Sequence, residues 1–293
     1  MQRKRNSSNH QKSIERSCKV YFADNIKMGK LVVFWSPFAG QSKVTSTMCA
    51  VAGAIGITYP NLELALTHAQ MDSMELEERL DFRPGASDKK ELYEKTGIAA
   101  LQLNYMQAAL TSEKIRSCAI PLLMKSLYLF PGSGRQEIKE DVQFQILTEK
   151  LVDEFDLTFL DLKSGISDSS NKLLQIADGV VVVLPQREVC WDKLLENSME
   201  MLTGKKVCLV IGGYLKNSRY SLDFFKRKKN IKGKDYFLGA VSMNTAYMDA
   251  MEAGRCLEFF LKNELVERKE ENYEFISQTK RIAEYIKTEL LVS

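Results

Sequence analysis

Short apolar runs that alternate with longer helix-like segments constrain this fold more than any other feature of the sequence. Several runs are apolar at nearly every position, which is typical of strands buried on both faces of a parallel sheet. Right-handed crossovers through helices then give a doubly wound α/β fold, and we expect a mostly parallel sheet of about seven or eight strands flanked by helices. The expected strands are 31–36, 62–67, 127–130, 157–162, 180–185, 207–213 and 236–241.

The segments between these runs either show apolar residues at helical spacing or are rich in small residues. The expected helices are 45–55, 88–110, 142–155, 191–202 and 275–291, with a further short helix that ends at 177–178. Neither a repeat nor a linker divides the chain, so we expect one domain over residues 30–293. Residues 1–29 start with a basic stretch that no apolar segment follows. We expect a flexible extension there, with an arm that contacts acidic lipid or nucleic acid as the alternative, and no secretory signal.

Composition excludes several classes of function. The six cysteines are scattered and form no C-x-x-C pair, which favours buried thiols in a reducing cytoplasm over disulfides. The only histidines are His10 and His68, so we expect neither zinc nor haem. A serine hydrolase lacks support because the sequence contains no G-x-S-x-G segment. No apolar run approaches the roughly 20 residues that cross a bilayer.

The segment FWSPFAGQSKVTSTMCAVAGAIG (34–56) joins an apolar strand to a small-residue helix, as a phosphate-binding loop does. The usual lysine followed by serine or threonine is missing, and two registers are possible. In the first, Lys43 is the phosphate lysine and Val44 stands at the metal-binding hydroxyl. In the second, which we favour, Thr45 is that hydroxyl and Val44 replaces the lysine, while Lys43 takes a glycine position. The candidate nucleotide-binding residues here are Gly40, Gln41, Ser42, Lys43, Val44, Thr45 and Ser46.

A second candidate element follows the expected strand 157–162. Asp161 ends that strand and Gly165 comes four residues later. A carboxylate at the carboxyl end of a strand can hold Mg²⁺, and a nearby glycine lets its N–H approach a γ-phosphate. Because ligand sites in such sheets lie at the carboxyl ends of the strands, we expect Thr45, Asp161 and Gly165 to meet there. We predict Thr45 and Asp161 as Mg²⁺ ligands and Asp161 as the catalytic residue, against a simple turn or helix-cap role for Asp161.

Three segments resemble a known family: FDLTFLDLKSGI (155–166), ADGVVVVLPQ (177–186) and FLGAVSMNTAYMDAMEAGRCLEFF (237–260). They are similar to the switch strand, the next strand and the late glycine-containing block of the MinD/ParA superfamily of P-loop ATPases, which belong to the SIMIBI class. The resemblance extends over roughly residues 30–290. Within it, FWSP, the G-Q before the helix, and LTHAQMDSMELEERL (66–80) resemble the TadZ/CpaE branch, which positions Tad-type pilus machinery in bacteria.

The sequence departs from this superfamily at residues that act on ATP. The lysine that crosses an ATP-sandwich dimer falls at Ala39 in the favoured register, or at Phe38 in the other. The acidic D-x-D after the second strand becomes THAQ (67–70), and the asparagine that reads adenine corresponds to Gly212. Losing one such charge contact costs on the order of 3–4 kcal/mol of transition-state stabilisation. The resemblance therefore implies at most slow hydrolysis, with weak binding of ATP and Mg²⁺.

The expected function follows from the resemblance. It implies a cytoplasmic, degenerate MinD/ParA-type factor that positions or scaffolds a surface machine, such as a Tad-type pilus or a related secretion assembly. Its partners would be a second copy of itself, assembly proteins, and the inner face of the membrane. The alternative is an active ParA-type partition ATPase that binds DNA non-specifically. The basic cluster Lys226–Lys234 fits DNA or anionic lipid, or else a solvated helix end, and the amphipathic helix 275–291 packs on the sheet or lies on a membrane.

Overall fold

A computed structural model describes most of the chain. The described residues are 29–40, 42–70, 74–80, 95–107, 110–132, 141–228 and 236–291. Residues 1–28 of the predicted extension, Gln41, and 229–234 of the basic cluster lie outside these ranges.

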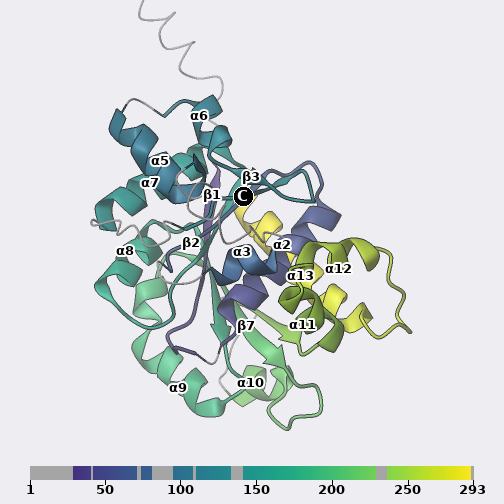
Figure 1. Ribbon diagram of the computed structural model, residues 1–293. Helices are drawn as coiled ribbons and strands as arrows, with labels where there is room; N and C mark the ends of the chain where they lie inside the picture. The colour runs from purple at the N-terminus through teal and green to yellow at the C-terminus, as the bar shows by residue number, and fades with distance from the viewer. Residues whose placement is uncertain are drawn as a thin grey trace, which may run out of the picture.

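The centre of the protein is an eight-stranded sheet with the order β3-β4-β2-β5-β1-β6-β7-β8 (Figure 1). All neighbouring strands are parallel except β3 and β4, which are antiparallel. This architecture confirms the predicted fold class. The strands are β1 (Lys30–Trp35), β2 (Leu64–His68), β3 (Ile120–Pro121), β4 (Leu127–Leu129), β5 (Leu157–Asp161), β6 (Gly179–Leu184), β7 (Lys206–Tyr214) and β8 (Phe237–Ser242).

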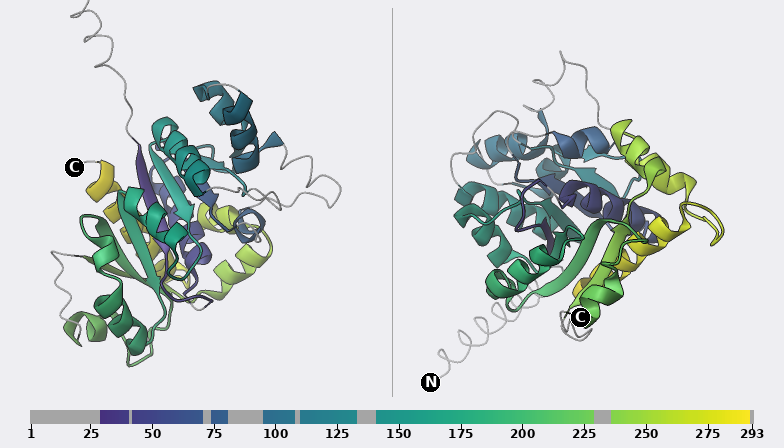
Figure 2. Two further views of the ribbon diagram at one scale, coloured as in Figure 1. Left: turned by 90° about the vertical axis from the view of Figure 1, so that its left-hand side faces the viewer. Right: turned by 90° about the horizontal axis from the view of Figure 1, so that it is seen from below.

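Helices cover both faces of the sheet, and each face has its own apolar core. On one face lie α2 (Val44–Thr58), α3 (Glu75–Arg79), α11 (Thr245–Glu252), α12 (Cys256–Lys262) and α13 (Tyr273–Leu291). On the other lie α5 (Gly97–Gln107), α6 (Ser112–Ser117), α7 (Asp141–Glu154), α8 (Asp168–Ile176), α9 (Glu188–Asn197) and α10 (Leu222–Lys228), with the short 3-10 helix η1 (Glu200–Leu202). The right-hand view of Figure 2 looks at the sheet from the carboxyl ends of its strands.

The small residues of α2 let neighbouring helices approach closely. A Cβ atom on Gly53 would lie 2.3 Å from the ring of Phe260 in α12, so only glycine fits there. The other neighbour, α13, packs against α2 and β8. Its apolar side, which includes Ile282 and Ile286, is buried in the same core. That side of the C-terminal helix is therefore covered by protein, as the sheet-packing alternative predicts.

Two predicted helices differ from the observed ones. The predicted helix 88–110 is observed as α5, which starts at Gly97, while 81–94 lie outside the described residues. Gly97 has φ +71° and a Cβ there would lie 2.3 Å from the Pro131 carbonyl oxygen, so the helix begins at a turn that needs glycine. The predicted helix 191–202 is two elements, because α9 ends at Asn197 and η1 follows. Asparagine has a low helix propensity, which favours an end there.

Candidate functional site

The loop after β1 is closed by hydroxyl groups. The Ser36 and Ser42 hydroxyls share a hydrogen bond of 2.6 Å, and the Phe38 amide donates to Ser36 Oγ at 3.2 Å. Gly40 has φ +76° with open space around it. Lys43 has φ +57° and is the one non-glycine residue with positive φ among those the structure describes. The loop therefore wraps tightly before α2, and Lys43 holds a backbone conformation that usually requires glycine.

Thr45 and Asp161 are brought into contact by α2 and β5. Helix α2 begins at Val44, whose side chain packs in the core, and one residue later Thr45 Oγ1 donates to Asp161 Oδ2 at 2.5 Å. This is the contact that the second register requires, with a hydroxyl beside the strand-end carboxylate and a glycine-like position at Lys43. The first-turn amides of α2 have no carbonyl partner within the helix, and such a helix N-terminus favours an anion.

Asp161 is buried with an incomplete set of partners. Its side chain is 1% exposed, and its Oδ1 atom accepts no hydrogen bond in the described part of the chain. Burial raises the pKa of Asp161 to about 6, although the hydrogen bond from Thr45 opposes the shift. A buried carboxylate oxygen without a partner is costly, and a bound cation would remove that cost.

The residues present fit Mg²⁺ held jointly with a phosphate. No group of three or more His, Cys, Asp or Glu side chains in the described ranges could hold a metal alone. A magnesium ion at Thr45 and Asp161 would therefore complete its shell with water and phosphate oxygens, which is its usual coordination in nucleotide sites. The orphaned Asp161 Oδ1 is the atom that such an ion would satisfy.

A buried ion pair fills the place of the acidic D-x-D segment. His68 lies opposite Asp161 in the β2–β5 register, and its Nε2 atom lies 2.8 Å from Glu77 Oε1, to which the Gly132 amide also donates at 3.0 Å. Burial alone would lower the pKa of His68, but the hydrogen bond to Glu77 and the negative charges of Glu77 and Asp161 together raise it. At Glu77 burial alone would raise the pKa, but the bond and charge of His68 and the backbone hydrogen bonds together lower it. The two side chains are therefore paired, and Glu77 is a buried carboxylate that sequence reasoning missed.

Gly165 is bonded to the end of β1. It has φ +110°, its amide donates to the Ser36 carbonyl at 2.8 Å, and its carbonyl accepts from the Trp35 indole at 2.8 Å. The N–H that we predicted to meet a γ-phosphate is therefore occupied in this conformation. The bond to the Ser36 carbonyl would have to break before that amide could reach a ligand.

The end of β7 explains why the predicted adenine position is a glycine. A Cβ on Gly212 would lie 2.3 Å from the Ser42 carbonyl oxygen, so the loop rests directly on β7 and leaves no room for asparagine. The next residue, Gly213, has φ +67° and lies under the aliphatic chain of Lys43. The departure from the superfamily pattern is thus a packing requirement of this loop.

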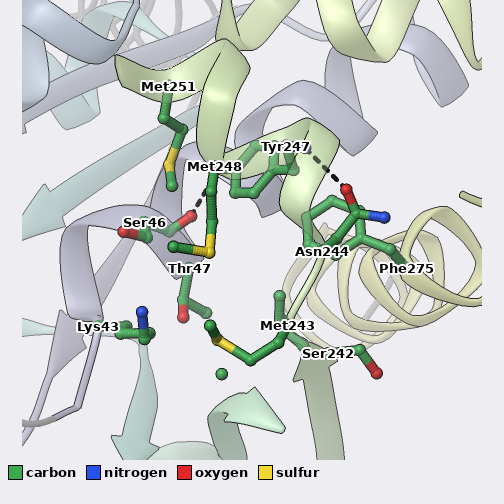
Figure 3. A pocket seen from close by; sticks show the side chains of 12 residues that line it. Lys43, Ser46, Thr47, Ser242, Met243, Asn244, Tyr247, Met248, Met251 and Phe275 are labelled. Carbon is green, nitrogen blue, oxygen red and sulfur yellow. Dashed lines mark hydrogen bonds between the residues drawn. The ribbon is translucent and has the colours of Figure 1, made fainter. Parts of the chain in front are cut away.

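A narrow cavity of about 30 Å³ lies between Lys43 and the end of β8 (Figure 3). Tyr247 holds its wall in place, because the Tyr247 hydroxyl donates to the Ser46 carbonyl at 2.7 Å and its amide donates to Asn244 Oδ1 at 2.7 Å. Such a volume holds about one or two waters. The cavity is lined by Lys43, Ser46, Thr47, Gly213, Val241, Ser242, Met243, Asn244, Tyr247, Met248, Met251 and Phe275.

The predicted surface sites are only partly described. Of the basic cluster, Lys226, Arg227 and Lys228 end α10, and Lys228 pairs with Glu188 at 2.5 Å. Its role toward DNA or lipid stays a prediction. Within the described residues, no helix is long and apolar enough to span a membrane. The five described cysteines are buried and free.

Comparison with protein-family models and with curated protein sequences gives no match. Solved structures do match. A ParA family ATPase from Chlorobium tepidum TLS aligns with a TM-score of 0.65 and 14% identity, covering 87% of this chain and 98% of that one. The septum site-determining protein MinD from Pyrococcus horikoshii OT3, complexed with Mg-ADP, aligns with a TM-score of 0.66 and 11% identity over 91% and 98%.

A plasmid partition protein from Borrelia burgdorferi B31 bound to AMPPNP gives a TM-score of 0.56 and 16% identity over 89% and 99% of the two chains. These similarities extend over nearly the full length of each solved chain. Identities this low show a shared fold alone. The chain therefore has the fold of the MinD and ParA P-loop ATPases.

Proposed function

We propose that this protein is a nucleotide-binding positioning or scaffolding factor of the MinD/ParA type, with slow or absent hydrolysis. The observation that carries the proposal is the 2.5 Å contact between Thr45 Oγ1 and Asp161 Oδ2 at the first turn of α2. It joins a hydroxyl, a buried carboxylate and unpartnered helix amides at the carboxyl edge of a parallel sheet, where ligands of such folds bind.

Each part of the site would have a separate role. The first-turn amides of α2 and the left-handed loop would hold phosphate oxygens, and Thr45 and Asp161 would hold Mg²⁺. The bound ion would neutralise phosphate charge. His68 and Glu77 neutralise each other, so neither is free to orient an attacking water. Val44 and Ala39 carry no charge where the superfamily has lysines, and hydrolysis is therefore slow.

Calorimetry of Mg-ATP binding tests the proposal. We expect weak binding by the wild-type protein, and none by Asp161→Ala, which removes a metal ligand. The matched control is Asp153→Ala, because Asp153 is an exposed carboxylate on α7. Equal heats for wild type and Asp161→Ala, or no binding by the wild type at millimolar Mg-ATP, would contradict the proposal. A turnover assay in the same buffer separates slow from brisk hydrolysis.

We propose further that the machine positioned is a Tad-type pilus or a related secretion assembly, with the protein acting as a homodimer. The support is the resemblance of FWSP and LTHAQMDSMELEERL to the TadZ/CpaE branch. A fluorescent fusion should gather with the pilus assembly proteins in bacterial cells. The active ParA-type alternative predicts salt-sensitive DNA binding that is lost when Lys228 and Lys229 are reversed in charge.

A further inference from the structure

One cation near the candidate site comes from outside the loop. Arg79 ends α3, which packs against α2 and α11. Its Nη1 atom lies 3.5 Å from Ser46 Oγ, in the first turn of α2, and 3.7 Å from Met251 Sδ in α11. Ser46 directly follows Thr45 and is fixed by Tyr247, which donates to its carbonyl at 2.7 Å. The guanidinium is therefore held beside the first turn of α2, which is the candidate phosphate-binding turn.

The charge of Arg79 is only partly balanced. Its side chain is 25% exposed, and its buried Nε atom has no hydrogen-bond partner in the described part of the chain. Nη2 donates to Glu75 at 3.1 Å, but that carboxylate is 56% exposed. Ion pairs with exposed partners are weak because water competes for both charges. Buried N–H groups without partners cost free energy, so Arg79 has donor capacity available for an anion.

Arginine suits phosphate for geometric reasons. The planar guanidinium can donate two parallel hydrogen bonds to one phosphate group and stays charged at any pH relevant to the protein. The loop itself presents Val44 and Ala39 where lysines would stand, while Lys43 lies over Gly213 at the end of β7. Arg79 approaches the first turn of α2 from the side on which α3 and α11 lie.

We propose that Arg79 is a phosphate-binding residue that supplies, from α3, cationic charge that the loop of this protein has lost. Its ligand is the polyphosphate chain of a Mg²⁺-bound nucleotide at the first turn of α2, so this inference rests on the proposed function. Ser46 and Met251 position the guanidinium. Arg79, brought in by the packing of α3, thus supplies positive charge that is missing from the loop sequence.

Affinity measurements on full-length variants test this assignment. Arg79→Met removes the charge and the Nη1 contacts but keeps an unbranched apolar side chain. It should weaken Mg-ATP binding about 10- to 100-fold, since that is the worth of one hydrogen bond to a charged group. Arg79→Lys should lose less, and Arg268→Met, which removes an exposed arginine, should lose nothing. Inorganic tripolyphosphate with Mg²⁺ serves as a second ligand, and its binding should weaken with Arg79→Met by the same factor.

Glu75→Gln gives an independent test that leaves Arg79 in place. Removing the competing carboxylate should tighten Mg-ATP binding severalfold, even if Arg79→Met folds poorly. Unchanged affinity in both Arg79→Met and Glu75→Gln, while Asp161→Ala abolishes binding, would overturn this inference and leave the proposed function standing. Weakening for ATP but not for tripolyphosphate would also overturn it, because the contact would then be to the nucleoside. Absence of binding by the wild type would overturn both.

Discussion

Replacing Asp161 by asparagine should raise the free energy of unfolding above that of the wild type. The gain should be larger at neutral pH than at acid pH. Burial raises the pKa of Asp161 to about 6 from its ordinary 3.8. One pH unit corresponds to about 1.36 kcal/mol, so ionising this group in the folded protein costs on the order of 3 kcal/mol. The asparagine side chain of the variant would keep an acceptor for the Thr45 hydroxyl but carry no charge. The cost should therefore disappear in the variant.

The direction of the pH dependence follows from the two protonation states. Below about pH 3.8 the carboxyl is protonated whether the chain is folded or unfolded, and it carries no penalty. Between about pH 3.8 and 6 folding takes up a proton, so the free energy of unfolding of the wild type falls as the pH rises. Above about pH 6 the full penalty is present. The stability of Asp161→Asn minus that of wild type should thus grow by about 2.4 kcal/mol from pH 4 to pH 7.5.

Urea denaturation followed by circular dichroism measures this difference. Asp153→Asn is the control, because Asp153 is exposed and its replacement should shift stability by less than about 0.5 kcal/mol at every pH. Mg-ATP at 100 times its Kd should stabilise the wild type and Asp153→Asn by about 2.7 kcal/mol, but not Asp161→Asn. A stability difference that stays constant across the pH range would refute the reasoning, because Asp161 would then carry no buried charge.

Two further substitutions probe the surroundings of the site. Gly212→Asn should destabilise the protein by more than about 2 kcal/mol in thermal melts, since its Cβ would meet the Ser42 carbonyl. Gly204→Asn should cost less, because the space around Gly204 is open and asparagine tolerates its φ of +78° better than most residues. Glu77→Gln should cost about 3–5 kcal/mol near pH 6, because it leaves His68 buried and charged without its partner. That cost should shrink as the pH rises through the raised pKa of His68, and a pH-independent cost would contradict the ion-pair assignment.

The strands could be predicted because burial on both faces requires a continuous run of apolar residues in the sequence. VVVVLP and VCLVIGG are apolar throughout, and they match β6 and β7 closely. β3 consists of only Ile120 and Pro121 and pairs antiparallel at the sheet edge, so it has no run of this kind. The start of α5 depends on the fit of Gly97 against Pro131, which is a tertiary contact without a local pattern.

The candidate site also contains some residues that could be predicted from the sequence and others that could not. Thr45 lies in the first turn of the helix that follows β1, and Asp161 ends the neighbouring strand β5, so the topology of a parallel sheet is sufficient to bring them together. Glu77 and Arg79 lie within a charged segment, ELEER, in which every polar residue looks alike. Their burial against His68 and Ser46 depends on how α3 packs, and only the structure reveals it.

The bonds of Gly165 affect how tightly any nucleotide can bind. To offer its amide to a phosphate, Gly165 must leave the Ser36 carbonyl, and the Trp35 indole must release the Gly165 carbonyl or move with it. Each hydrogen bond contributes about 0.5–1.5 kcal/mol, so breaking one or both costs about 0.5–3 kcal/mol and weakens binding about 2- to 150-fold. In a loop with lysines at positions 39 and 44 the phosphate contacts would offset this cost easily. Here the remaining cations must do so, and the closed arrangement at Gly165 therefore predicts weak binding of any nucleotide.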